Sequence, residues 1–128
     1  MDWIGDLKFR SGEGEPPLEL HSSTTGRLSP TMLIAYAEMA CMGMDIVHVL
    51  QKGRHDLRKL HVGFDSERAK EHPRRFLTMK LHFDITGNVA DHVVERAIQL
   101  SREKYCSVSN SLREDIDLQT SFTIHRDK

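Results

Sequence analysis

A helix-forming stretch from Thr31 to Leu50 constrains the fold most, because it is apolar on nearly every side. A surface helix of a globular protein carries one apolar stripe and one charged face. Here apolar residues cover almost every direction around the helix axis: Met32, Leu33, Ile34, Ala35, Tyr36, Ala37, Met39, Ala40, Met42, Met44, Ile46, Val47, Val49 and Leu50. Such a helix is either buried all round or lies in a membrane.

Burial against a second copy of the chain explains this helix better than a membrane does. At about 20 residues the stretch is long enough to cross a bilayer. However, Glu38, Asp45 and His48 within it make insertion costly, and the segments on either side have the pattern of a soluble protein. A chain of 128 residues has little material to wrap such a helix. We therefore expect no membrane partner, and a homodimer in which the partner covers what this chain cannot.

The charge balance gives no sign of a nucleic-acid partner. Eighteen Lys and Arg stand against nineteen Asp and Glu, for a formal net charge of -1. This near balance creates no field that would steer the molecule onto nucleic acid or an anionic membrane. The length predicts a single domain over residues 1–128.

The two cysteines, Cys41 and Cys106, are expected to be thiols. The start of the sequence, Met1 to Asp6, lacks the charged and apolar regions of a signal peptide, so we expect a cytoplasmic protein. In a reducing compartment, a disulfide between the two would be transient and functional.

The hydrophobic pattern predicts an α+β domain with the element order ββαββααβ. An opening hairpin precedes Ser29 and Pro30, which form a good helix start. The expected elements are strands over 7–9 and 18–21, a helix over 31–52, strands over 57–69 and 76–86, a helix from 87–88 to 105, a short helical turn over 107–114, and a strand over 116–124.

The thiol of the first helix lies in a polar stripe. At about 100° per residue, one sector of the helix holds all its polar exceptions. Cys41 is flanked there by Glu38 at i-3 and Asp45 at i+4. A cysteine that simply fills a gap in the core is the plain alternative. The carboxylates fit that alternative poorly, because a dry core tolerates ionised groups only when they are paired.

A nucleophilic Cys41 would need a positive charge nearby. The reactive form is the thiolate, and neighbouring carboxylates oppose its formation. Arg27 just before the helix, Arg10 on the opening hairpin and His48 on the helix itself are the candidates. The sequence does not choose among them.

Cys106 is a second candidate nucleophile. It lies where the second helix is expected to end and a short helix to begin, and amides at the new N-terminus, together with Lys104, would lower the pKa of its thiol. A chance pair of core thiols remains the alternative.

Several segments together resemble the OsmC/Ohr family of thiol-dependent peroxide reductases, in its generic OsmC-like branch. Ser29-Pro30 leads an apolar helix that reaches Cys41 and Met44-Asp45-Ile46-Val47. The later landmarks are Glu71-His72-Pro73-Arg74-Arg75-Phe76, Val94 to Ser101, and Lys104-Tyr105-Cys106-Ser107-Val108-Ser109. They cover nearly the whole chain in the family's order.

The resemblance implies antiparallel sheets packed on two long helices in an intertwined homodimer, with the active site at the interface. It implies that Cys41 is the peroxidatic residue and Cys106 the resolving one. An organic hydroperoxide would oxidise Cys41 to a sulfenic acid, Cys106 would condense with it, and an external thiol or dithiol would restore both thiols. No cofactor and no metal are expected, and the eight histidines lack a ligand-like spacing.

The chain departs from the family pattern at one pair of residues. The family usually places a Glu one or two residues after the helix-opening Pro, paired with an Arg from the first hairpin, whereas this chain has Thr31 and Met32. Glu38 is a possible stand-in for the acid, with Arg27 or Arg10 as its partner. The alternative function is an OsmC-like dimer without efficient peroxidase activity, which binds a small hydrophobic ligand or senses redox state.

Overall fold

The computed structural model describes residues 1–22 and 26–126, which form two compact units. The first unit is Met1–Tyr36 and the second is Ala37–Lys128. The division falls inside the first helix, α1 (Pro30–Lys52). The thiols therefore belong to the second unit.

The first unit contains a small antiparallel sheet of three short strands. β2 (Lys8–Arg10) pairs with β3 (Glu19–His21), which is the predicted hairpin. β1 (Asp2–Trp3), which the sequence did not predict, pairs with the other edge of β2. A two-residue strand is too short to show an alternating pattern. Trp3 in β1 and Leu7 just before β2 are 67% and 71% exposed, so the first unit leaves apolar side chains uncovered.

Helix α1 begins as the sequence predicts. The Ser29 hydroxyl accepts a hydrogen bond from the Met32 amide at 3.2 Å, which caps the first turn, and Pro30 occupies the first helical position. Further along, Met42, Ile46 and Leu50 recur four residues apart and are fully buried. This stripe fixes which side of residues 37–52 faces the core.

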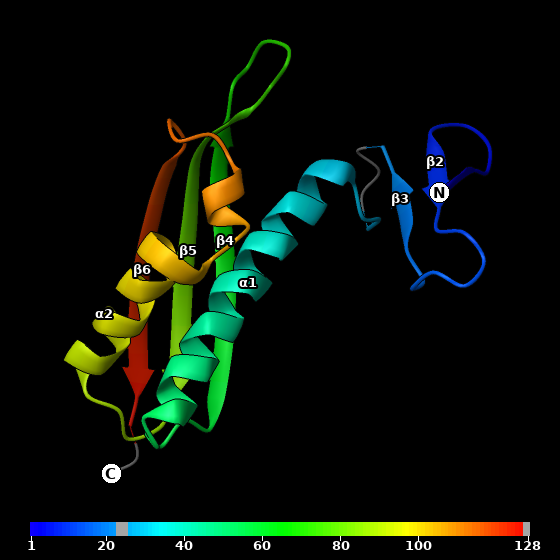
Figure 1. The fold of residues 1–128 in the computed structure, drawn as a ribbon. Coiled ribbons are helices and arrows are strands. Elements are labelled where there is room, and N and C mark those ends of the chain that lie inside the picture. Colours follow the sequence, from blue (N-terminus) through cyan, green and yellow to red (C-terminus); the bar gives the residue numbers. More distant parts are fainter. Residues whose placement is uncertain (23–25, 127–128) are drawn as a thin grey trace. The chain divides into compact units, whose positions relative to one another are not determined.

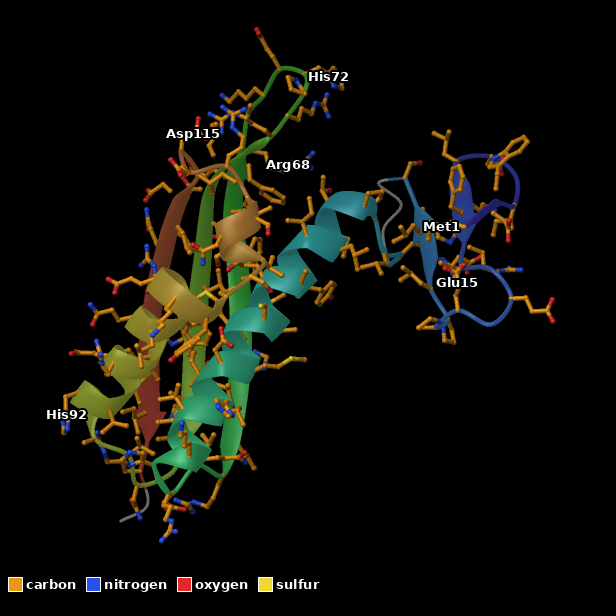
Figure 2. The ribbon with its side chains drawn as sticks, in the orientation of Figure 1. Met1, Glu15, Arg68, His72, His92 and Asp115 are labelled. Atoms are coloured by element: carbon orange, nitrogen blue, oxygen red, sulfur yellow. The ribbon has the colours of Figure 1, made fainter. Side chains whose placement is uncertain are left out.

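The second unit is built on a sheet with the strand order β4-β5-β6 (Figure 1). β4 (Lys59–Arg68) and β5 (Phe76–Thr86) form the predicted antiparallel hairpin, and the predicted bounds of β5 are confirmed. At one end of the sheet, Figure 2 shows Arg68 and Asp115 close to the hairpin loop that carries His72. Arg75 and Asp115 form an ion pair of 3.5 Å there.

The expectation of purely antiparallel sheets is wrong for β6 (Asp117–His125), which runs parallel to β5. Between these strands the chain crosses the sheet through α2 (Asp91–Leu100) and returns to its starting end. A crossover of this kind joins parallel strands. Alternation within a strand reveals its faces but not the direction of its neighbour.

The second helix is shorter than predicted. α2 ends at Leu100 and continues as a π-helical turn, η1 (Ser101–Tyr105), in which the Cys106 amide donates to the Ser101 carbonyl at 2.8 Å. A 3₁₀ turn, η2 (Ser109–Ser111), follows where a longer helical turn was expected. The predicted helix that ends at 105 is therefore a ten-residue α-helix followed by a π-helical turn.

The core lies between the sheet and one layer of helices. Residues 37–52 of α1 and all of α2 cover the same face of the sheet (Figure 1). Its buried residues include Met79, Leu81, Phe83 and Ile85 of β5, with Met42, Ile46 and Leu50 of α1 and Val94, Ala97 and Ile98 of α2. The α+β class is confirmed.

Helix α1 remains largely uncovered within the chain. By length and composition it is the one described helix that could cross a membrane. Only 28% of its apolar 18-residue stretch is buried within the protein. Met44 in its middle is 70% exposed.

Candidate active site

The fold brings the two cysteines together from distant segments. Cys41 lies on α1, and Cys106 directly follows η1. The Sγ atoms of Cys41 and Cys106 and a carboxylate oxygen of Asp45 all lie within 4.8 Å of one another. Both thiols are free.

Cys106 is fully buried, and its environment keeps it a neutral thiol. Burial raises the pKa of Cys106 to about 11, and the Cys41 thiol and the charge of Glu38 act in the same direction. Hydrogen bonds from Ser109 oppose this shift, including one from its amide to Sγ at 3.3 Å. The expected amide at a helix start is therefore present, but burial outweighs it.

A buried acidic residue, Glu38, lies next to Cys106. Its side chain is 0% exposed. Oε1 accepts a hydrogen bond from the Cys106 thiol at 3.8 Å and a short one from the Ser109 hydroxyl. Oε2 is buried and has no hydrogen-bond partner in the described part of the chain.

Cys41 is half-buried and has a more polar surrounding. Its sulfur lies 3.9 Å from the Ser107 hydroxyl. Asp45, one turn further along α1, accepts a hydrogen bond from the buried Ser101 hydroxyl at 2.8 Å. This bond links α1 to the π-helical turn that precedes Cys106.

The predicted positive charges are not gathered around Cys41 within the second unit. In residues 37–126, no described hydrogen bond or ion pair joins an arginine to Cys41, and His48 is exposed. Arg10 and Arg27 belong to the first unit. Arg10 is exposed and pairs there with Glu19 at 3.3 Å.

The three ligand-type groups at the site are poorly prepared for a metal ion. Thiolate ligands must lose their protons before they bind, whereas Cys106 holds its proton up to a pKa of about 11. Asp45 already accepts a hydrogen bond from Ser101. We assign no metal to this cluster and treat it as a dithiol.

A cavity of about 390 Å³ opens on the Glu38 side of the cluster. Its lining includes Glu38, Ser109, Arg102 and Arg113. Glu38 and Ser109, which both hydrogen-bond with Cys106, therefore border this cavity.

Three serines that position the site were not predicted from the sequence. Ser101, Ser107 and Ser109 each hydrogen-bond to a cysteine or an acidic residue of the cluster. The signal was present in the hydroxyl-rich segment Cys106-Ser107-Val108-Ser109. What could not be seen was which acid each hydroxyl would meet.

Comparisons with known proteins identify the family of this chain. The family model of the OsmC-like protein matches residues 22–121. Protein YhfA of Escherichia coli (strain K12) is 37% identical over 127 residues, which cover 97% of this chain and 95% of YhfA.

Two crystal structures illustrate the fold. A hypothetical protein from Aquifex aeolicus VF5 has a TM-score of 0.89 at 23% identity, with 99% of this chain and 94% of that chain covered. An organic hydroperoxide resistance protein OsmC from Legionella pneumophila has a TM-score of 0.67 at 20% identity, with 96% and 99% covered. At these identities the likeness concerns the fold alone. From the family model and the full-length relative, the chain belongs to the OsmC-like protein family.

Proposed function

We propose that this protein reduces organic hydroperoxides with its two thiols and thereby protects against oxidative stress. The observation that carries the proposal is the approach of the Cys41 and Cys106 sulfurs to within 4.8 Å. Membership of the OsmC-like family supports a redox role, as does the likeness in fold to the organic hydroperoxide resistance protein from Legionella pneumophila.

In the proposed reaction, the Cys41 thiolate attacks the distal oxygen of a hydroperoxide ROOH. The O–O bond breaks, the sulfur becomes a sulfenic acid, and the departing alkoxide takes up a proton to give the alcohol. Cys106 then forms the S–S bond and releases water. An external thiol or dithiol reduces the disulfide and is itself oxidised.

The assignment of roles follows from the two environments. Cys41 is half-buried and can meet a hydroperoxide, whereas Cys106 is fully buried and has its pKa raised to about 11. A thiol that stays protonated reacts slowly with peroxide. Cys106 is therefore suited to react with the sulfenic acid of the neighbouring Cys41 rather than with the hydroperoxide.

We further propose that the working form is a cytoplasmic homodimer. The apolar helix α1 is mostly uncovered within the chain, and the first unit exposes Trp3 and Leu7. A unit of fewer than about 40 residues rarely stabilises itself. A second copy would cover both surfaces, and Arg10 or Arg27 of either copy is our proposed source of positive charge for Cys41.

One departure from the family pattern favours an alternative function. The helix-opening Pro30 is followed by Thr31 and Met32 where the family usually has a Glu. Without that acid and its paired arginine, the protein would bind a small hydrophobic ligand or sense oxidants at low turnover.

A single-turnover thiol count separates these functions. Reduced protein receives one equivalent of cumene hydroperoxide, and free thiols are counted over time. We expect wild type to lose both thiols, Cys106→Ser to accumulate a sulfenic acid that dimedone traps, and Cys41→Ser to stay unreacted. Omitting the hydroperoxide gives the control.

Unchanged thiols in wild type after an hour would exclude the peroxidase and leave the ligand-binding alternative. A reactive Cys41→Ser beside an inert Cys106→Ser would reverse the two roles.

A further inference from the structure

Glu38 is a buried carboxyl group for which the family pattern provides no role. It lies eight residues beyond Pro30, well past the position of the usual family acid. A fully buried carboxylate is costly unless its oxygens are hydrogen-bonded. Only Oε1 is satisfied, by Cys106 and Ser109, and Oε2 has no partner among the described residues. A side chain kept for packing alone would not need this charge.

The hydrogen bonds direct Glu38 to the resolving thiol. The Cys106 S–H points to Oε1 at 3.8 Å, and the Ser109 amide donates to the same sulfur at 3.3 Å. An acceptor for the proton and a donor for the resulting anion therefore meet at one sulfur atom. This is the arrangement that a thiol needs in order to ionise at the moment of attack.

We propose that Glu38 is the catalytic base of the resolving step and removes the proton of Cys106 as its sulfur attacks the Cys41 sulfenic acid. The proposal rests on the peroxidase function above and adds a residue to it. The departing hydroxide of the sulfenic acid takes the proton and leaves as water, so the S–S bond forms with no further oxidant. When the disulfide is later reduced, the external thiol supplies the proton for the leaving Cys106 thiolate, and Glu38 is placed to relay it.

The raised pKa of Cys106, about 11, supports the need for such a base. At neutral pH only a very small fraction of a thiol of that kind is ionised. Without help, the resolving step would depend on that fraction. A positioned base contributes on the order of 10²-fold or more to a proton transfer.

Other charged groups face the site from the elements around it. Asp45 and Cys41 lie on the same helix, and the remaining ones line the cavity beside Glu38: Arg102, Arg113, Glu114 and Asp117. Among the hydrogen bonds and ion pairs described for residues 37–126, none gives Glu38 a cationic partner. Asp45 is the competing base, because its carboxylate also lies within 4.8 Å of Cys106 Sγ.

The test follows the two steps separately in the full-length protein. One equivalent of cumene hydroperoxide is added, samples are alkylated at set times, and mass spectrometry counts the Cys41 sulfenic acid and the disulfide. In Glu38→Gln we expect sulfenic acid to form at the wild-type rate and the disulfide to form about 10²-fold more slowly. Glu114→Gln, at the same cavity but without contact to a thiol, is the matched control and should behave as wild type.

The pH profile distinguishes a base from a structural residue. For Glu38→Gln, disulfide formation should accelerate about tenfold per pH unit, because only ionised Cys106 reacts. The wild-type rate should rise much less steeply, and Glu38→Asp, which keeps the carboxylate, should keep the shallow profile. If Glu38→Gln does not fold, the pH profiles of wild type and Glu38→Asp decide alone. A tenfold rise in the rate of disulfide formation per pH unit in both proteins overturns the proposal.

Failure of this proposal differs from failure of the peroxidase. Absence of any Cys41 sulfenic acid in Cys106→Ser would remove the peroxidase itself. Normal sulfenic acid with an unchanged resolving rate in Glu38→Gln would remove only the role of Glu38. A loss of the resolving step in Asp45→Asn but not in Glu38→Gln would assign the base to Asp45 instead.

Discussion

At the scale of single residues, Cys106 shows two opposing influences on one thiol. The Ser109 amide and hydroxyl lower its pKa, whereas burial, the neighbouring Cys41 and the charge of Glu38 raise it. Burial is the largest of these influences, because the sulfur is withdrawn from water on all sides. In the folded protein, Cys106 is therefore a neutral thiol at neutral pH.

The raised pKa of Cys106 makes the free energy of unfolding depend on pH in the alkaline range. The unfolded thiol ionises at roughly pH 9 and the folded one at a pKa of about 11. Because the folded state keeps its proton longer, the contribution of Cys106 is complete below pH 9 and disappears as pH rises toward 11. We expect the free energy of unfolding to fall by about 1–2 kcal/mol over this window. Urea unfolding at each pH measures it.

Cys106→Ser is the control for this prediction, because a serine hydroxyl does not ionise in the same range. The difference in unfolding free energy between wild type and the variant should shrink from pH 9 to pH 11. A constant difference would mean that the folded thiol ionises as readily as the unfolded one.

Residue types were easier to predict than residue partners. The sequence identified Cys41 and Cys106 as a pair and placed Glu38 beside Cys41 from its i-3 spacing. The observed hydrogen bond of Glu38 goes instead to Cys106, far away in the sequence. Helical spacing predicts neighbours on one helix, but it cannot tell which other element a side chain will meet.

At the scale of elements, one buried hydrogen bond joins α1 to the turn before Cys106. The Ser101 hydroxyl is fully buried and donates to Asp45 at 2.8 Å. Ser101 also begins η1, whose last hydrogen bond runs from the Cys106 amide to the Ser101 carbonyl. The position of Cys106 relative to Cys41 therefore depends on this serine.

We expect Ser101→Ala to lower the free energy of unfolding by about 1–2 kcal/mol, because a hydrogen bond to a charged group is lost. Disulfide formation after hydroperoxide treatment should also slow. Urea unfolding and the thiol count measure the two effects. Ser121→Ala is the control, since its hydroxyl bonds to His82 on the exposed face of the sheet, and it should change stability by less than about 0.5 kcal/mol. Equal effects of both substitutions would contradict this.

The elements that local chemistry defines were predicted well. Ser29 and Pro30 identify the start of α1, and strict alternation identifies β5 over Phe76–Thr86. The parallel direction of β6 and the π-helical end of α2 were not predicted. These two features depend on how a segment packs against residues far away in the sequence. A local sequence pattern therefore cannot predict them.

At the scale of the whole molecule, apolar surface is left without a cover in each unit. Met44 on α1 is 70% exposed, and Trp3 in the N-terminal sheet is 67% exposed. Exposed apolar side chains that gather on one element are typical of an interface. The proposed homodimer accounts for both with one kind of partner.

We expect Met44→Glu to weaken the dimer at least tenfold, because a buried unpaired charge would replace an apolar contact. Sedimentation velocity over a concentration series measures the dissociation constant. Gln119→Glu adds the same charge on the exposed side of β6 and should leave the dimer intact. A wild-type chain that sediments as a monomer at every concentration would remove the dimer from the proposal.

The π-helical turn before Cys106 has a consequence for insertions and deletions. Its i to i-5 hydrogen bond holds one residue more than an α-helical turn would. Deleting one of Arg102, Glu103 or Lys104 would make the bond from the Cys106 amide to the Ser101 carbonyl an ordinary i to i-4 bond, so this turn can lose one residue while Cys106 stays near its place. Of the three, Arg102 is the costly one to lose, because its guanidinium donates to the Leu118 carbonyl at 2.8 Å and to the Thr120 hydroxyl at 3.3 Å.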